Sequence, residues 1–298
     1  MKKLFPVFIF LLIPALIIPL QVTNAKKNKD TFHLDEVYPL GTDGRVELYS
    51  DDADVEIKGS DRSDVHVVVD YEARTSGIYW SSEDRPFSVE VFSEGDDLII
   101  REVDRDVTTV GLVVNRRLTR YDILIEVPKE ANLKIRGEDD DYDIRNVEGD
   151  ISMHFEDGDA VIEGCRGNNF NFEVEDGSIE MEGGRGSLEV FLEDGYFSVS
   201  EGDFKEINAE AEDGELEIAT TLNDEGSYHI ECEDGEINLT ILGGGGEFKV
   251  SYEDGRVKAS GDFEIAEEDD DFSFYDLPGG NARVRIRMED GRVRLTNR

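Results

Sequence analysis

Apolar and polar residues alternate along most of the chain in short runs that end at the same turn, Glu-Asp-Gly. In the stretch FLEDGYFSV, residues 191–199, one alternating run stops at the triplet and another begins directly after it. Alternation with a period of two is typical of strands that bury one face. Since no stretch after residue 25 has a helical period, the pattern predicts an all-β protein.

The Glu-Asp-Gly triplet recurs at nearly regular intervals of 18 to 21 residues, with one last interval of 36. Apolar residues keep a fixed phase to each glycine, seven, five and three positions before it and two and four after it. Such a period is typical of architectures in which one unit cannot bury its own apolar face and neighbours must stack. The long interval predicts a degenerate copy around Asp270, and further copies precede the series at Ala53 and Asp140. The glycines are Gly158, Gly177, Gly195, Gly214, Gly235, Gly255 and Gly291.

The alternation changes phase across each triplet, so the chain must bend there. Glycine supplies the positive φ that a tight turn requires, and aspartate tolerates the same geometry. In a β-solenoid each triplet is a corner that stacks on the next, whereas in an antiparallel β meander each Asp-Gly pair closes a hairpin. The pattern of residues leaves both architectures open.

Residues 121–164 carry a family pattern. It consists of a strand that ends in Val127-Pro128-Lys129, then Leu133-x-Ile135, then Gly149-Asp150-Ile151 and further strands of that kind. On these motifs the chain resembles the putative adhesin family of exported bacterial proteins of unknown function, over about residues 40–298. The resemblance implies a parallel β-helix (β-solenoid) of 18–21-residue coils, and it favours a non-enzymatic, adhesin-like or scaffolding module. Glu-Asp before the turn glycine departs from the family, which more often has Ser or Thr there.

The chain divides into three predicted parts. Residues 1–25 combine two lysines, an apolar run and a small residue at position 25, which is typical of a secretory signal peptide. A retained membrane anchor is the alternative, although three prolines interrupt the run. Residues 26–127 are predicted to form an irregular N-terminal β region that caps the solenoid, with a hairpin around residues 94–97, and residues 128–298 to form the repeat solenoid. We therefore expect an exported protein in the periplasm, at the cell surface or outside the cell, with no membrane span after signal cleavage.

The charge of the chain limits its partners. A formal net charge of -40 disfavours nucleic acid and anionic lipid, because a polyanion would approach a field of like charge. Cell-surface polysaccharide or an envelope protein remains as the expected kind of partner, and adaptation to high salt is another explanation for the acidity. Cys165 and Cys232 lie more than three repeats apart, which predicts two free thiols.

The acidic corners are the first candidate for chemistry. Stacked carboxylates provide the oxygen ligands that Ca²⁺ prefers, so a calcium-binding repeat protein is one alternative function, although the calcium-binding nonapeptide GGxGxDxUx is absent. Solvated turns that bind no ion are the other interpretation, and no other cofactor is expected. The candidate metal ligands are Asp157, Asp176, Asp194, Asp213, Asp234 and Asp254.

Catalytic motifs are missing from the sequence, and the four histidines are predicted to lie apart, so we expect no enzyme. A polysaccharide-degrading enzyme on the same scaffold is the alternative, by analogy of fold. Arg283, Arg285 and Arg287, on the outward face of the final coil, are candidate partner contacts, or they pair with a neighbouring coil around Asp270. Tyr79 and Trp80, in a segment expected to be irregular, are candidate partner contacts or part of the cap.

Overall fold

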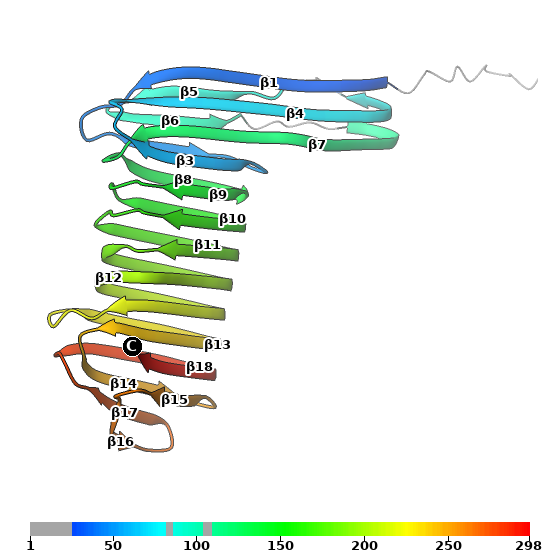
Figure 1. Ribbon diagram of the computed structural model, residues 1–298. Coiled ribbons are helices and arrows are strands. Elements are labelled where there is room, and N and C mark those ends of the chain that lie inside the picture. The colour runs from blue at the N-terminus through cyan, green and yellow to red at the C-terminus, as the bar shows by residue number, and fades with distance from the viewer. Residues whose placement is uncertain (1–25, 82–85, 104–108) are drawn as a thin grey trace, which may run out of the picture.

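The computed structural model describes residues 26–81, 86–103 and 109–298, and these contain eighteen strands in one continuous sheet. No helix occurs in this part of the chain, which confirms the all-β prediction. Figure 1 shows a column of stacked strands, with a longer ribbon that projects from its N-terminal end. The predicted signal peptide, residues 1–25, lies outside the described residues and stays a prediction.

The middle of the column is built from coils that stack in the order of the sequence. Each coil has two strand limbs that meet at a Glu-Asp-Gly corner, and successive coils pair in parallel with equivalent residues opposite each other. Gly158 thus pairs with Gly177, and Gly177 with Gly195. The architecture is solenoid-like, and the strands of these coils do not form the antiparallel meander. They are β10 (Ile151–Glu163), β11 (Asn169–Glu182), β12 (Arg185–Thr221) and β13 (Ser227–Gly243).

The apolar interior follows the predicted phase. In β10, for example, Ile151, Met153 and Phe155 before the corner and Ala160 and Ile162 after it are all buried. A buried side chain of this size contributes roughly 1.5–3 kcal/mol to folding, so each coil is stabilised mainly by its inner residues. Both cysteines are free, as the sequence predicted, and both are buried.

Close stacking explains why the corners keep glycine. A Cβ atom built on Gly195 would lie 2.2 Å from the carbonyl oxygen of Gly177 in the coil before it, and Gly195 has a φ of 146°. Any side chain there would have to push two coils apart. The glycine is therefore required by the neighbouring coil as well as by the turn.

At the C-terminal end, the order of coils in space differs from the order in the sequence. The last strand, β18 (Ala282–Asn297), pairs in parallel with β13 on one side. On its other side it pairs in parallel with β14 (Gly246–Tyr252) and β15 (Arg256–Ser260). The final segment of the chain is therefore inserted between two earlier coils, as the red strand in Figure 1 shows.

Beyond β14 and β15 the column ends in a hairpin. β16 (Glu264–Glu268) pairs antiparallel with β17 (Phe272–Leu277), and β17 pairs antiparallel with β14. The amide of Asp269 donates to the carbonyl of Phe272 at 2.9 Å, so Asp270 lies in the hairpin turn. The expectation of a degenerate coil corner at Asp270 is wrong, because the local hairpin satisfies the backbone there.

The N-terminal end of the column also contains an inserted coil. β2 and β3 form one coil, which lies between β8 and β9 on one side and β6 and β7 on the other. The chain therefore leaves the column after its first coil and returns later. The strands are β2 (Arg45–Tyr49), β3 (Asp54–Ser60), β6 (Asp97–Glu102), β7 (Thr109–Pro128), β8 (Asn132–Asp139) and β9 (Asp141–Arg145).

Antiparallel strands cover this end. β1 (Lys26–Pro39) pairs with β4 (Asp64–Ser81) and β4 with β7, and together they form the projecting ribbon in Figure 1. β5 (Val89–Glu94) and β6 form the predicted hairpin. Tyr79 and Trp80 belong to β4 and pair with Gly111 and Val110, so the part of the segment expected to be irregular that ends at Ser81 is a strand. Their side chains lie outside the described part of the chain.

Candidate functional site

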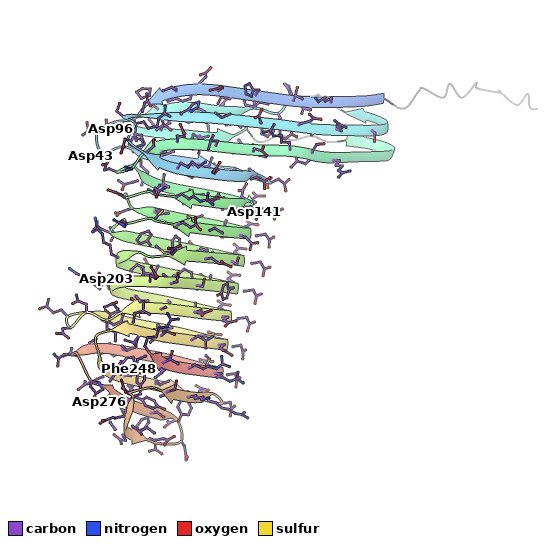
Figure 2. The ribbon with its side chains drawn as sticks, in the orientation of Figure 1. Asp43, Asp96, Asp141, Asp203, Phe248 and Asp276 are labelled. Atoms are coloured by element: carbon purple, nitrogen blue, oxygen red, sulfur yellow. The ribbon has the colours of Figure 1, made fainter. Side chains whose placement is uncertain are left out.

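The corners place carboxylates in a line along one edge of the column. Register pairs Asp139 with Asp157, Asp157 with Asp176, and Asp176 with Asp194. Neighbouring strands are about 4.8 Å apart, so the carboxylates repeat at about that spacing. In Figure 2 the line runs along the edge where Asp141 is labelled, two residues after Asp139. We call it the acidic ridge: the exposed aspartates Asp139, Asp157, Asp176, Asp194, Asp213 and Asp234, and the exposed glutamates Glu138, Glu156, Glu175, Glu193, Glu212 and Glu233.

Neighbouring carboxylates on the ridge affect each other's charge. The pKa of Asp157 is raised, first by desolvation and then by a hydrogen bond to Asp139 and by repulsion from Asp139 and Asp176. Repulsion of this kind favours a bound proton, a cation or a basic partner. At Asp157 the ridge therefore favours positive charge close to its carboxylates.

The predicted calcium ligands are distributed one to a coil. Asp254 lies at the corner between β14 and β15, where its amide donates to the carbonyl of Glu289 at 2.9 Å. In the described residues, one group of three carboxylates brings its ligand oxygens within 4.8 Å of one another, namely Asp51, Asp52 and Asp139 at the N-terminal end of the ridge. Binding of Ca²⁺ by the predicted aspartates stays a prediction.

A buried carboxylate, which sequence reasoning did not single out as functional, joins the first coil to the column. Asp140 occupies the position of the corner glycine and is fully buried. Its oxygens accept hydrogen bonds from the Ser50 hydroxyl (3.1 Å), the Ala53 amide (2.7 Å) and the Tyr142 hydroxyl (3.0 Å). Burial raises the pKa of Asp140 to about 6, although these hydrogen bonds oppose the shift. The signal in the sequence was an aspartate where the repeat requires glycine.

An aromatic cluster fills the N-terminal end of the core. The rings of Tyr71 and Phe87 stack with centroids 3.7 Å apart, and Tyr121 meets Phe87 edge to face at 4.9 Å. A hollow of about 980 Å³ opens beside these rings and is also lined by Arg101 and Arg136. The sequence did not predict this cluster, because its members come from three separate segments without a shared motif.

Arg283, Arg285 and Arg287 lie on β18, which is inside the column rather than at its end. Arg287 pairs with Glu231 of β13 at 3.3 Å and with Glu289 at 3.1 Å. Arg283 and Arg285, like Arg287, are exposed on the outer face of β18. The expectation that these three arginines pair with a coil around Asp270 is wrong, because β18 is inserted next to β13. A role of these arginines in contact with a partner stays a prediction, as does a role of Tyr79 and Trp80.

In-register coils around a shared apolar interior define a solenoid-like repeat protein. The chain belongs to the Toastrack DUF4097 family, whose model matches residues 44–296. The family membership predicted from the sequence is confirmed by this match. No match was found among curated proteins.

Several solved structures are similar to the chain at low identity. A putative cell adhesion protein from Clostridium sporogenes is 14% identical, with 92% of this chain and 100% of that chain covered and a TM-score of 0.30. A putative adhesin from Bacteroides fragilis is 9% identical, with 91% and 97% covered and a TM-score of 0.39. A putative lipid binding protein from Parabacteroides distasonis is 14% identical, with 90% and 96% covered and a TM-score of 0.36. In the described residues, no helix is long and apolar enough to cross a membrane.

Proposed function

We propose that this protein is a parallel β-helix that works as an exported, non-enzymatic, adhesin-like or scaffolding module of the bacterial cell envelope. The observation that carries the proposal is the acidic ridge, since in-register stacking repeats one pair of carboxylates on coil after coil. A surface repeated in this way suits an extended partner that is contacted at many points. Individually weak contacts then add up to high avidity.

The construction of the column supports this role. Each coil contacts its neighbours through backbone hydrogen bonds and buried side chains, which holds the carboxylates at fixed spacing. A binding surface that is already ordered loses little conformational entropy when a partner binds. The expected partners are cell-surface polysaccharide or an envelope protein that offers cationic groups, directly or through bridging Ca²⁺.

Glycan binding and turnover test the proposal together. The purified protein is applied to a glycan array with and without calcium, and a bound glycan is then assayed for release of reducing ends. We expect binding without product, and weaker binding by a variant in which Glu175, Asp176, Glu193 and Asp194 are changed to their amides. Release of reducing ends would instead support the polysaccharide-degrading enzyme. Protease accessibility on intact cells tests the expected exposure on the cell surface.

A further inference from the structure

Basic side chains gather on the last coils of the column, on either side of the acidic corners. We call this set the C-terminal basic band: Lys249 on β14, Arg256 and Lys258 on β15, and Arg283, Arg285, Arg287, Arg292 and Arg294 on β18. Insertion of β18 beside β14 and β15 brings cations into register. Arg285 lies opposite Lys249, Arg292 opposite Arg256, and Arg294 opposite Lys258. Like charges directly opposite each other destabilise a sheet unless an anion neutralises them.

Carboxylates of the same chain neutralise only part of the basic band. Glu236 of β13 pairs with Arg292 at 3.2 Å and also contacts Arg294, so one carboxylate serves two guanidinium groups. Glu247 lies opposite Arg283 in the register but forms no ion pair with it in the described part of the chain. Within the described residues, the members of the band without an ion pair are Lys249, Arg256, Lys258, Arg283 and Arg285.

The acidic ridge has the complementary charge and the same spacing. Its carboxylates repeat at the strand spacing of about 4.8 Å, and the cation pairs Arg292 with Arg256 and Arg294 with Lys258 are separated by that same spacing. Both arrays derive their spacing from the backbone, so they match over the two rungs that the band occupies. Opposite charge and an equal repeat together make the two surfaces complementary.

We propose that the C-terminal basic band of one copy docks against the acidic ridge of a second copy of this chain. This inference rests on the scaffolding role proposed above and names a partner for it. The contact joins two different surfaces, so a docked pair still offers one free ridge and one free band. Contacts of this kind build open-ended chains unless the rotation between copies closes a ring.

Salt has two opposing effects on such a contact. Two bodies with a net charge of -40 repel each other at long range, and this repulsion reaches about 30 Å at 0.01 M salt but only about 8 Å at 0.15 M. The short-range pairing between band and ridge is itself screened at about 1 M, where the screening length is about 3 Å. Association is therefore expected to be strongest near 0.15 M and weaker at both extremes.

Sedimentation velocity of the purified full chain over a concentration series tests the inference. We expect concentration-dependent assemblies near 0.15 M salt. In the variant Arg256→Glu/Lys258→Glu, the dissociation constant should be raised at least about tenfold. The matched control is Arg185→Glu/Lys205→Glu, which makes the same change in net charge on exposed residues outside the band and should associate like the wild type. Should Arg256→Glu/Lys258→Glu lower the melting temperature, Arg256→Gln/Lys258→Gln replaces it.

Complementation between two defective variants identifies the two surfaces. A ridge variant, Asp176→Lys/Asp194→Lys, should also fail to associate alone, and its mixture with the band variant should form mixed assemblies. The inference is overturned if the wild type stays monomeric at every concentration, if the band variant associates like the wild type, or if the mixture does not assemble. A monomeric wild type that binds an acidic polysaccharide such as polygalacturonate through the band would overturn self-docking and leave the adhesin-like role standing. Self-association without binding to any envelope component would instead overturn the adhesin-like role.

Discussion

In the middle of the column, from β10 to β13, each coil pairs with the coil that follows it in the sequence, whereas at both ends a coil pairs with segments far away. Arg292 of β18, for example, contacts Glu236, 56 residues earlier. Sequential coils can form one after another with short loops, but an inserted coil requires both neighbours to be in place before it docks. The middle of the column therefore shows how the repeat is extended coil by coil, and the two ends show how it is terminated by segments from elsewhere in the chain.

Disruption of the inserted strand β18 should give the largest difference in local stability between the middle and the C-terminal end. Ile286→Asp puts a charge at a fully buried position of β18, so we expect a destabilisation of at least about 4 kcal/mol at that end. Hydrogen exchange should show lost protection in β13, β14 and β15 and retained protection in β10 and β11. The substitution Val190→Asp in β12 is the matched control and should instead reduce hydrogen-exchange protection in the middle of the column. Equal loss of protection along the whole column would mean that inserted and sequential coils unfold as one unit.

The buried carboxylate at the N-terminal end predicts that the stability of this end depends on pH. The pKa of Asp140 is about 6 in the folded protein and 3.8 ordinarily, so the unfolded chain gives up this proton at lower pH than the folded chain. Stability from this group is therefore full below about pH 4 and decreases as pH rises to about 6, by roughly 3 kcal/mol. Denaturant titrations at several pH values should show a smaller decrease for Asp140→Asn than for the wild type. The exposed neighbour variant Asp141→Asn should keep the decrease, and identical pH profiles for wild type and Asp140→Asn would contradict the assignment.

Substitutions at corner positions should lower stability by different amounts in the two regions. Gly195→Ala places a methyl group against the Gly177 carbonyl at a positive φ, so we expect a cost of about 1–3 kcal/mol. Ala53, in the inserted first coil, occupies the equivalent position and already carries a side chain, so Ala53→Gly should cost less than about 1 kcal/mol. Thermal unfolding of both variants provides the comparison. A negligible effect of Gly195→Ala would mean that neighbouring corners leave room for a methyl group between them.

The smallest effect is expected for the ion pairs of the inserted strand. Glu236→Gln removes the carboxylate shared by Arg292 and Arg294, which are about half exposed, so we expect a loss of about 0.5–1 kcal/mol. Glu180→Gln, on an exposed position of β11, is the control and should change stability less. The difference should vanish at high salt, because screening weakens exposed pairs first.

The repeat could be predicted from the sequence, but the order of the coils in space could not. Phase relative to each glycine predicted the buried faces, the corners and the burial of Cys232, because burial follows directly from alternation. Insertion of β18 could not be predicted, since every coil shows the same phase and would fit beside any other. The role of Asp140 and the contacts of Phe87 depend on which distant segments meet.

The spacing of the corners is the most direct test of the central claim, that coils stack in parallel with one corner per rung. Spin labels are attached to cysteines at positions 157 and 234, with Cys165 and Cys232 replaced by alanine, and their separation is measured by pulsed electron paramagnetic resonance. Four rungs separate these corners, so the stacked coils predict about 20 Å. An antiparallel meander has two strands for each repeat and would place the labels about 40 Å apart, which would contradict the account.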